Sequence, residues 1–516
     1  MLIGDLLETN AATWPGVDAI VAGERRMSYA QLHARAGCLS RALAGTAAPG
    51  DRVAILSTNR PEYVEAFYGV PTAGMILTLL NYRLTAREWG FILRDAGVRV
   101  LLVEARFVQD LGEAMQGLDA LERVIVIGDA PQGWQAYEEF LAAAPREVSL
   151  PPAREDDVAC LIYTSGTTGF PKGAMISHRN IVSGALAAAL EQRLPVHPRA
   201  LLSFPMCHAS GFTIFMHHLR AGTLFLPPAF APGEWLADVE AHRITHANLA
   251  PTMASFVLEH PDWPKADLSS LQMLSYGGMA MSASVARALA PRVGSLTTGF
   301  GQSESTFLVT YMDDAWHRRA LAGQEEILKS CGRAMALSTV DVLDENLQRC
   351  APGTVGELCV RGPLVMRGYW NNPQATAEAT QGGWLHTGDL ARRDEHGLFY
   401  IVDRQKDMLK TGGQNVYPRE VEQLLVTHPA VREVAVVGMP DPVWGENVVA
   451  AVVRHAGESL TGQELIAWCA GRIAGYKKPR HVVFVDELPH NVTGKVIKRE
   501  LRERLAARLP KNEEVS

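Results

Sequence analysis

Several features that would assign this sequence quickly to a class are missing from it. No stretch of 18 uninterrupted apolar residues occurs among its 516 residues, so we expect no membrane-spanning helix. The first residues carry Asp5 and Glu8 but no basic segment, which argues against a signal peptide, and the last residues match no peroxisomal or ER address. We therefore expect a cytoplasmic protein without an integral membrane segment.

Paired cysteines and an excess of positive charge are also missing. The chain has seven cysteines, an odd number, and no CxxC pair, which argues against a disulfide framework or a structural zinc site and for a reducing compartment. The net charge of −7 excludes a globally basic nucleic-acid binder. The charge is uneven, because the chain from Asp403 onward has 17 Lys and Arg against 15 Asp and Glu, and the rest has 32 against 41. A mildly basic tail region on an acidic body would suit a small anionic ligand.

The composition that is present is that of an ordinary globular protein, with 47% hydrophobic and 20% charged residues. The chain is too long for one core, so we expect at least two domains. Strand-like and helical runs alternate in its first part, which predicts an α/β architecture with parallel sheets. The expected strands are 52–57, 98–105, 123–128 and 158–163, and the expected helices include 28–43, with Ser28 as N-cap, and one that starts at Ser177. Beyond 390–412 the pattern predicts a smaller α+β unit of about 110 residues.

One short stretch, YTSGTTGFPKGA at 163–174, has the composition of a phosphate-binding loop. Its glycines would let backbone N–H groups approach an anion, and its hydroxyls and one ammonium could complete the cradle. It is no Walker A loop, because Lys172 is followed by Gly173 and not by Ser or Thr. This argues against a phosphate-loop NTPase that makes ADP and drives motion or assembly. The alternative without function is a surface turn rich in small residues.

The stretch resembles the phosphate-loop signature of the adenylate-forming superfamily, which contains acyl-CoA synthetases, peptide-synthetase adenylation domains and beetle luciferases. Four further segments resemble motifs of the same family, in family order over nearly the whole chain. They are GFGQSEST at 299–306, WLHTGDL at 384–390, YIVDRQKDMLKTGGQNVYPREVE at 400–422 and LPHNVTGKVIKREL at 488–501.

The resemblance implies a fold, a domain division and a reaction. The fold is α/β, with a large N-terminal domain (1–402) of stacked α/β sheets plus a β-barrel-like subdomain, a hinge (403–406) and a small mobile α+β C-terminal domain (407–516). The reaction is an ATP-dependent, AMP-forming ligation. A carboxylate attacks the α-phosphate of MgATP to give an acyl-AMP, and a thiol then displaces AMP. ATP, Mg²⁺ and coenzyme A are the implied cofactors.

The resemblance also implies nucleotide and metal ligands. Glu304, with Thr164, would bind Mg²⁺, a hard cation that prefers oxygen ligands. The sequence departs from the family motif at Phe300, which replaces a tyrosine, and at Ser303, which replaces a threonine. Asp389 would bind the ribose hydroxyls, although a turn-capping aspartate is the plainer alternative. The implied ATP- or AMP-binding residues are Thr164, Ser165, Gly166, Thr167, Thr168, Lys172, Gly277, Gly278, Thr298, Gly299, Phe300, Gly301, Ser303, Asp389 and Arg404.

Three residues are the implied catalytic ones. Lys495 would bridge the carboxylate and the α-phosphate, His208 would gate the passage between the acyl pocket and the thiol, and Lys410 would assist thioester formation. A buried, hydrogen-bonded histidine is the plainer alternative for His208. Lys406 occupies the hinge position. The implied coenzyme A-binding residues are Gly412, Gly413, Tyr476, Lys477 and Lys478, of which the last three could equally form an exposed basic turn.

The segment SFPMCHASGF at 203–212 bears on the substrate. Amino-acid-activating relatives carry an aspartate here that pairs with the substrate ammonium, whereas this chain has Cys207 and His208. We therefore expect a fatty or aryl acid, with an apolar aliphatic or aromatic tail, in a pocket formed by Ser210, Gly211, Phe212, Met279, Thr306, Phe307 and Leu308. A carrier-protein thiol remains the alternative acceptor to CoA. A homodimer is compatible with the sequence, and no nucleic-acid partner is expected.

Overall fold

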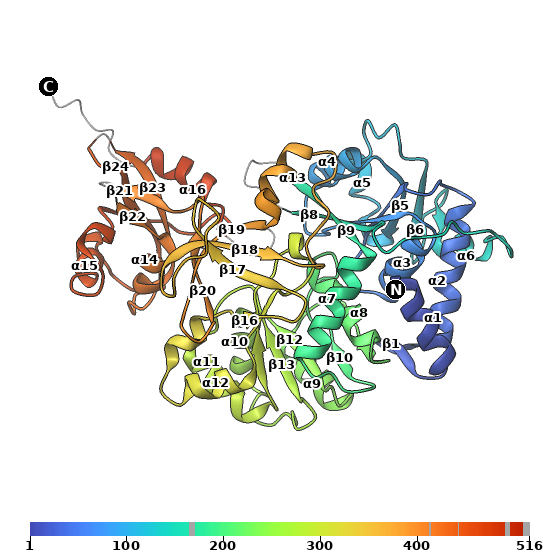
Figure 1. Cartoon of the computed structure of the whole chain (residues 1–516), viewed down its shortest axis with the longest axis horizontal. Helices are drawn as coiled ribbons and strands as arrows, with labels where there is room; N and C mark the ends of the chain where they lie inside the picture. The colour runs from blue at the N-terminus through green and yellow to red at the C-terminus, as the bar shows by residue number, and fades with distance from the viewer. Residues whose placement is uncertain (165–170, 412–413, 442, 491–495, 509–516) are drawn as a thin grey trace. The chain divides into compact units, whose positions relative to one another are not determined.

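The computed structural model describes residues 1–164, 171–411, 414–441, 443–490 and 496–508 (Figure 1). Seven of the predicted site residues lie outside the described residues: Ser165, Gly166, Thr167, Thr168, Gly412, Gly413 and Lys495.

Contacts between Cα atoms divide the chain into two units. Unit 1 contains Met1–Asp341, Cys359–Thr387 and Asp394–Tyr400, and unit 2 contains Val342–Leu358, Gly388–Arg393 and Ile401–Ser516. The two units therefore interleave along the chain. Unit 2 begins its last segment beside the predicted domain boundary at 402/403, and the hinge at 403–406 stays a prediction.

One seven-stranded sheet of unit 1 leads to the predicted phosphate loop. Its pairs from β6 to β8 are parallel, and β9 joins β8 antiparallel. Every residue of β4 is buried, and so are the last four of β3, as expected for a parallel sheet covered on both faces. The strand order is β7 (Gln135–Ala136), β6 (Arg123–Ile127), β5 (Val98–Glu104), β3 (Arg52–Leu56), β4 (Ile76–Leu80), β8 (Val158–Thr164) and β9 (Lys172–Ser177).

The second seven-stranded sheet of unit 1 is parallel except for β2, which pairs antiparallel with β1. It packs a core that includes Leu249, Leu274 and Leu296, all fully buried. The strand order is β14 (Leu296–Thr298), β13 (Met273–Tyr276), β12 (His246–Leu249), β10 (Arg199–Leu201), β11 (Thr223–Phe225), β1 (Asp18–Ala22) and β2 (Arg25–Ser28).

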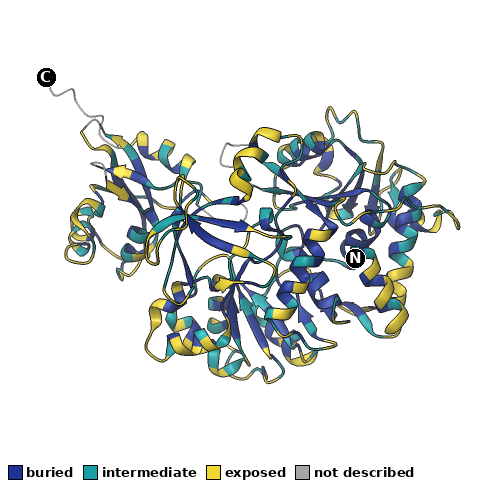
Figure 2. Cartoon of the chain, viewed as in Figure 1, coloured by how far each residue is buried: buried dark blue, intermediate teal, exposed yellow. Residues whose placement is uncertain are grey.

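Two helices of unit 1 begin at the serines that the sequence indicated. Ser28 accepts a hydrogen bond from Gln31 N at the start of α2, and Ser177 accepts one from Asn180 N at the start of α7. Buried residues follow the strands and the inner helix faces (Figure 2). The helices are α1 (Ile3–Thr13), α2 (Tyr29–Ala44), α3 (Pro61–Thr72), α4 (Ala86–Ala96), α5 (Leu111–Ala114), α6 (Tyr137–Ala142), α7 (His178–Glu191), α8 (Thr213–His218), α9 (Pro232–Ala241), α10 (Pro251–Glu259), α11 (Ala283–Leu289), α12 (Asp314–Leu321) and α13 (Pro373–Ala379).

Two small sheets follow in the chain. One has two strands, β15 (Thr310–Tyr311) and β16 (Arg333–Ala334), and the other has the order β17 (Thr339–Leu343), β18 (Val355–Arg361), β19 (Leu385–Arg393) and β20 (Phe399–Arg404). The α/β fold class is confirmed, and the barrel-like subdomain stays a prediction.

The C-terminal part of unit 2 is built on a five-stranded sheet. Alternate residues of its long strands face two different cores: Val448, Ala450 and Val452 on one face, and Val449 and Ala451 on the other. The strands are β22 (Gln414–Val416), β21 (Leu409–Thr411), β24 (Gly445–Arg454), β23 (Val431–Asp441) and β25 (His481–Phe484), with helices α14 (Pro418–Leu425), α15 (Gly462–Trp468) and α16 (Lys498–Ala506). Among the residues described, no helix combines the length and the apolar character that crossing a membrane requires.

Candidate active site

The predicted phosphate loop lies in a β-hairpin. Thr164, at the end of β8, pairs with Lys172, at the start of β9, and Tyr163 pairs with Gly173. The return strand β9 was not among the predicted strands, since the sequence indicated only a helix after the loop. A Cβ at Gly173 would come within 2.9 Å of the Tyr163 ring, so the close pairing requires glycine there. The hairpin places a hydroxyl and an ammonium at the two ends of the loop.

The carboxylate of Glu304 lies against this hairpin. Its Oε1 accepts hydrogen bonds from Thr164 Oγ1 at 3.2 Å and from the Tyr369 hydroxyl at 2.9 Å. Lys172 Nζ lies over the Tyr369 ring, 5.2 Å from its centroid. Burial, and then the Glu304 charge, raise the pKa of Tyr369, so its phenol stays protonated and donates. The predicted residues Thr164, Lys172 and Glu304 are thus brought together, and Tyr369 was missed by the sequence reasoning.

The chain around Glu304 is held by tight backbone packing. A Cβ at Gly301 would come within 2.3 Å of Phe307 O, and one at Gly299 within 2.2 Å of Thr310 O. Phe300 N donates to Thr310 Oγ1 at 2.9 Å. Glycine is therefore needed for a close crossing of two segments here, independently of any nucleotide.

Four other residues predicted to bind the nucleotide are described: Thr298, Ser303, Gly277 and Gly278. The Thr298 hydroxyl donates to Tyr276 O at 2.8 Å and so joins β14 to β13. Ser303 begins a short 3₁₀ turn. A Cβ at Gly277 or Gly278 would meet nothing within 4 Å, and Gly278 has a φ of +87°. These two glycines leave open space beside the strand β13.

Thr306, a predicted pocket residue, has an unusual backbone. Its φ of 63° and ψ of −51° are those of the rarer form of γ-turn, and Phe307 N donates to Ser305 O across it at 2.6 Å. The Thr306 side chain is fully buried and donates to Leu364 O at 2.7 Å. A β-branched residue is strained in this conformation, so the bond to Leu364 O stabilises a turn that directs the next residue, Phe307.

The Phe307 ring forms part of an aromatic wall. It stacks on Phe212 with a centroid distance of 6.4 Å and an interplanar angle of 24°. A Cβ at Gly184 of α7 would come within 2.7 Å of the Phe307 ring, so this ring fills the space in front of α7. Phe212 in turn contacts Phe67 edge to face. The two predicted pocket residues Phe212 and Phe307 therefore lie together.

His208 and the other predicted pocket residues lie in surroundings that differ from one residue to the next. His208 precedes the 3₁₀ turn at Ala209–Phe212, and Gly211 packs so closely that a Cβ would come within 2.3 Å of Met206 O. The Ser210 hydroxyl donates to Pro205 O. Leu308 pairs with Gly301 through its backbone, whereas Met279 is 53% exposed. Burial raises the pKa of the neighbouring Cys207 to about 12, so this thiol stays neutral.

Unit 2 contains a second cluster of predicted residues. Arg404 Nε is 2.6 Å from Asp389 Oδ1, and the Asp389 side chain is 5% exposed. Asp403 accepts hydrogen bonds from the backbone N–H groups of Arg404 and Arg419, and burial raises its pKa. Gln405 N donates to Gly388 O. Asp389 and Arg404 thus form an ion pair anchored by backbone bonds.

The remaining predicted residues of unit 2 are less clearly functional. Lys406 is exposed. Lys410, on β21, is also exposed, and its backbone N–H donates to the Glu446 carboxylate. Lys477 Nζ binds both oxygens of Glu420 at 2.8 Å, so its charge has a structural partner. Tyr476 is 43% exposed, and Lys478 is half-buried.

Trp444 is an exposed aromatic residue of unit 2 that sequence reasoning missed. It is 42% exposed, and the Arg480 guanidinium lies 4.1 Å from its ring centroid. The sequence signal was weak, since a lone tryptophan and an arginine 36 positions later form no motif.

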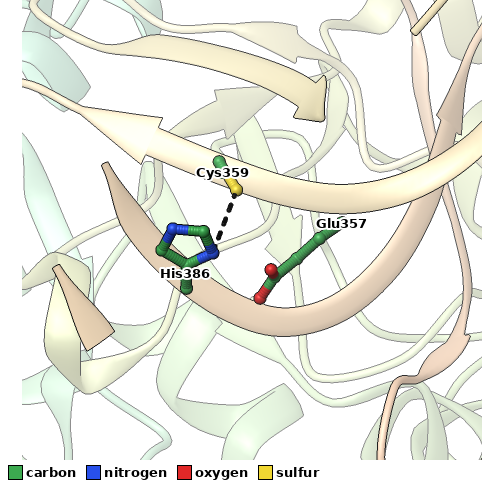
Figure 3. Close-up of side chains that lie close together, drawn as sticks. All are labelled: Glu357, Cys359 and His386. Atoms are coloured by element: carbon green, nitrogen blue, oxygen red, sulfur yellow. Dashed lines mark hydrogen bonds between the residues drawn. The ribbon is translucent and has the colours of Figure 1, made fainter. Parts of the chain in front are cut away.

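One group among the described residues could offer three donors to a metal ion. The donor atoms of Glu357, Cys359 and His386 all lie within 4.8 Å of one another (Figure 3). Cys359 Sγ and His386 Nδ1 are 3.7 Å apart, and Glu357 Oε1 accepts from Gly388 N at 2.9 Å. These donors are hydrogen-bonded within the protein, and we assign them no ion.

Comparison with protein-family models decides the family. The model described as AMP-binding enzyme matches residues 7–370, and that described as AMP-binding enzyme C-terminal domain matches residues 420–495. The chain belongs to the AMP-binding enzyme family. The resemblance to adenylate-forming enzymes is thereby confirmed.

Relatives of this AMP-binding enzyme are similar over nearly its whole length. A feruloyl-CoA synthase from Amycolatopsis sp is 38% identical over 95% of this chain and 96% of its own. A medium/long-chain-fatty-acid–CoA ligase from Mycobacterium tuberculosis is 36% identical over 93% of this chain and 86% of its own. The solved o-succinylbenzoate CoA synthetase from Bacillus subtilis, in complex with its acyl-adenylate intermediate, has a TM-score of 0.84 and 28% identity, and covers 96% of this chain and 97% of its own.

These findings establish the kind of enzyme. The AMP-binding enzyme described here is an AMP-forming acyl-CoA synthetase, an acid–thiol ligase. In the described part of the chain, Thr164 and Lys172, the two ends of the predicted phosphate loop, cluster with Glu304, the predicted metal ligand.

Proposed function

We propose that this ligase uses MgATP to activate a compact aromatic acid as an acyl-AMP and then transfers the acyl group to coenzyme A. The observation that carries the proposal is that Glu304, distant in the sequence, converges on Thr164 and Lys172, the two ends of one loop. A hydroxyl, an ammonium and a carboxylate in one place suit a metal-bound polyphosphate.

Each residue of this cluster has a proposed part in nucleotide binding. Lys172, with the loop residues Ser165, Gly166, Thr167 and Thr168, would neutralise the β- and γ-phosphates. Glu304 and Thr164 would hold Mg²⁺, which supplies charge neutralisation at the phosphates. Asp389 would accept hydrogen bonds from the ribose hydroxyls, and Arg404, now its ion-pair partner, would contact the ribose or phosphates.

The adenine and the carboxylate are assigned to neighbouring parts of the chain. The open backbone at Gly277 and Gly278 would accommodate one face of adenine, and Phe300 would contact the other. Lys495 would bridge the acid carboxylate and the α-phosphate, a place where a long, mobile side chain with a point charge is effective.

The substrate class is proposed from the aromatic wall. The Phe307 ring stacks on Phe212 and fills the space against Gly184, so the wall favours a short, flat acid over a long chain. The relatives include both classes, a feruloyl-CoA synthase and a medium/long-chain-fatty-acid–CoA ligase. His208 would separate this pocket from the thiol.

The thiol half-reaction is assigned to unit 2. Gly412 and Gly413 would line the pantetheine passage, with Lys410 beside it. Tyr476, the half-buried Lys478 and the Trp444–Arg480 pair offer aromatic and basic groups for the coenzyme A nucleotide, whereas Lys477 is engaged by Glu420. A homodimeric state and a cytoplasmic location stay predictions.

The test is product analysis with a panel of acids. The purified protein is incubated with MgATP, coenzyme A and ferulic, indoleacetic, medium-chain and long-chain fatty acids, and nucleotides and thioesters are analysed by mass spectrometry. AMP with an aromatic acyl-CoA as the main product supports the proposal. A fatty acyl-CoA as the main product overturns the substrate class, and acyl-AMP without any coenzyme A thioester overturns coenzyme A as the acceptor.

A further inference from the structure

We infer that Tyr369 is a positioning residue that keeps the Lys172 ammonium and the Glu304 carboxylate apart, and so keeps both available for a metal-bound polyphosphate. The inference rests on the proposed roles of Glu304 and Lys172 and concerns a residue outside the predicted site. Tyr369 uses two different parts of one side chain: its ring face lies under Lys172 Nζ, and its hydroxyl binds Glu304 Oε1.

Tyr369 is fixed in place by its backbone. Its N–H donates to Thr376 Oγ1 at 2.8 Å, near the start of α13, and its backbone pairs with Ala174 of β9. The next residue, Trp370, donates from its N–H to Gly173 O at 2.7 Å. These bonds hold the backbone of Tyr369 against β9, the strand that carries Lys172.

Glu304 is fixed by the neighbouring part of the same segment. Met366 N donates to Glu304 O at 2.8 Å, so residues 366–370 contact both the backbone and the side chain of this glutamate. Because the same segment pairs with β9, it links the phosphate-loop strand to the proposed metal carboxylate.

The electrostatic reason for such a spacer is simple. An ammonium and a carboxylate that both contact one tyrosine side chain attract each other, and an ion pair between them would have to break before phosphate and metal could bind. A phenol satisfies both groups with weaker, neutral interactions, a cation–π contact and a hydrogen bond.

The experiment measures metal binding and does not depend on turnover. Mn²⁺ binding to the full-length protein is followed by electron paramagnetic resonance with ATP and without acid, for the wild type and for Tyr369→Phe and Tyr369→Leu. Tyr369→Phe keeps the ring and should raise the Mn²⁺ dissociation constant about tenfold or more, the effect typical of losing a partner of a metal ligand. ATP affinity in EDTA should stay within about twofold for Tyr369→Phe and fall several-fold for Tyr369→Leu, which also removes the ring under Lys172.

Tyr163→Phe is the matched control. Its hydroxyl donates to Asp95 at 2.6 Å, so this variant also loses a phenol–carboxylate bond beside the hairpin, but at a carboxylate with no proposed metal role. Circular dichroism and melting temperature verify that each variant folds.

Three results would overturn the inference. Wild-type Mn²⁺ affinity in Tyr369→Phe would show that the hydroxyl does not position Glu304. An equal loss in Tyr163→Phe would show a general packing effect. Absence of ATP-dependent Mn²⁺ binding in the wild type itself would remove the proposed metal role of Glu304, a failure distinct from that of Tyr369 alone.

Discussion

Single residues in this enzyme take their roles from the register of the strands around them. Thr164 and Lys172 are eight positions apart, and the hairpin places them opposite each other. Glu304 then reaches Thr164 by a hydrogen bond of 3.2 Å. A change of one residue in this register would turn the side chains to the other face of the sheet.

At this scale the first prediction concerns Lys495. Lys495→Ala should lower the rate of acid-dependent pyrophosphate–ATP exchange by about a hundredfold or more, because it removes a charge that stabilises the adenylation transition state. Thioester formation from supplied acyl-AMP should stay within a few-fold of wild type. Lys498→Ala removes a lysine three positions later that pairs with Glu422, and it should leave the rates of both half-reactions within a few-fold of wild type. Equal losses of both half-reactions in Lys495→Ala would contradict the assigned role.

A second residue-scale prediction concerns Phe307. Phe307→Leu should shift the ratio of kcat/KM for a long-chain acid over an aromatic acid upward by about tenfold, since the smaller side chain opens space against Gly184 and removes the stack on Phe212. The measurement is steady-state kinetics with both acids.

Phe140→Leu is the control for this shift. Phe140 is a buried residue of α6 and is none of the predicted pocket residues, so its loss should lower stability without changing the substrate ratio. If the two variants changed the ratio alike, the wall at Phe307 would not set the substrate class.

At the scale of elements, the packing of helices and strands decides which histidines are buried away from water. Helix α8 places His217 and His218 in the core, where the Tyr68 hydroxyl is 2.8 Å from His218 Nδ1. Burial lowers the pKa of His178, His218 and His246 from 6.5 to about 4. These histidines are therefore neutral in the folded protein near pH 7.

The element-scale prediction is a loss of stability in acid. Unfolded histidine takes up a proton below about pH 6.5, whereas the folded groups do so only near pH 4, so their stabilisation is complete above pH 6.5 and is lost as the pH falls toward 4. Each contributes a loss of about 2 kcal/mol at pH 5, measurable by urea unfolding at pH 7, 6 and 5. His218→Asn should flatten this dependence, and the exposed His33→Asn should not. If the free energy of unfolding of His218→Asn depended on pH as steeply as that of the wild type, this prediction would be contradicted.

At the scale of the whole molecule, the proposed site residues belong to two units. The Thr164, Lys172 and Glu304 cluster lies in unit 1, and the Asp389–Arg404 pair lies in unit 2. The proposed reaction has two half-reactions, so a change in the arrangement of the units between them would let one chain serve both. The predicted hinge at Lys406 follows Gln405, whose N–H donates to Gly388 O.

The whole-molecule prediction tests this hinge. Lys406→Pro should restrict φ at the pivot, keep pyrophosphate–ATP exchange within a few-fold, and lower thioester formation by about a hundredfold. Lys406→Ala keeps backbone freedom and should retain both half-reactions. Parallel losses in the two half-reactions of Lys406→Pro would place the pivot elsewhere.

The sequence by itself determined the fold class, the family and several of the elements. Buried strands such as 98–105 and capped helices such as the one after Ser28 could be predicted, because apolar period and capping chemistry are local. The family motifs indicated Thr164, Lys172, Glu304 and Asp389 because each lies in a short segment of distinctive composition.

Only the tertiary structure decided how these segments meet. The strand β9, the Tyr369 contacts and the Phe212–Phe307 stack each join residues distant in sequence, and no local pattern specifies such pairs. The sequence also did not show that Lys477, predicted to bind coenzyme A, is hydrogen-bonded to Glu420. Long-range contacts depend on how elements pack, and packing is a property of the whole fold.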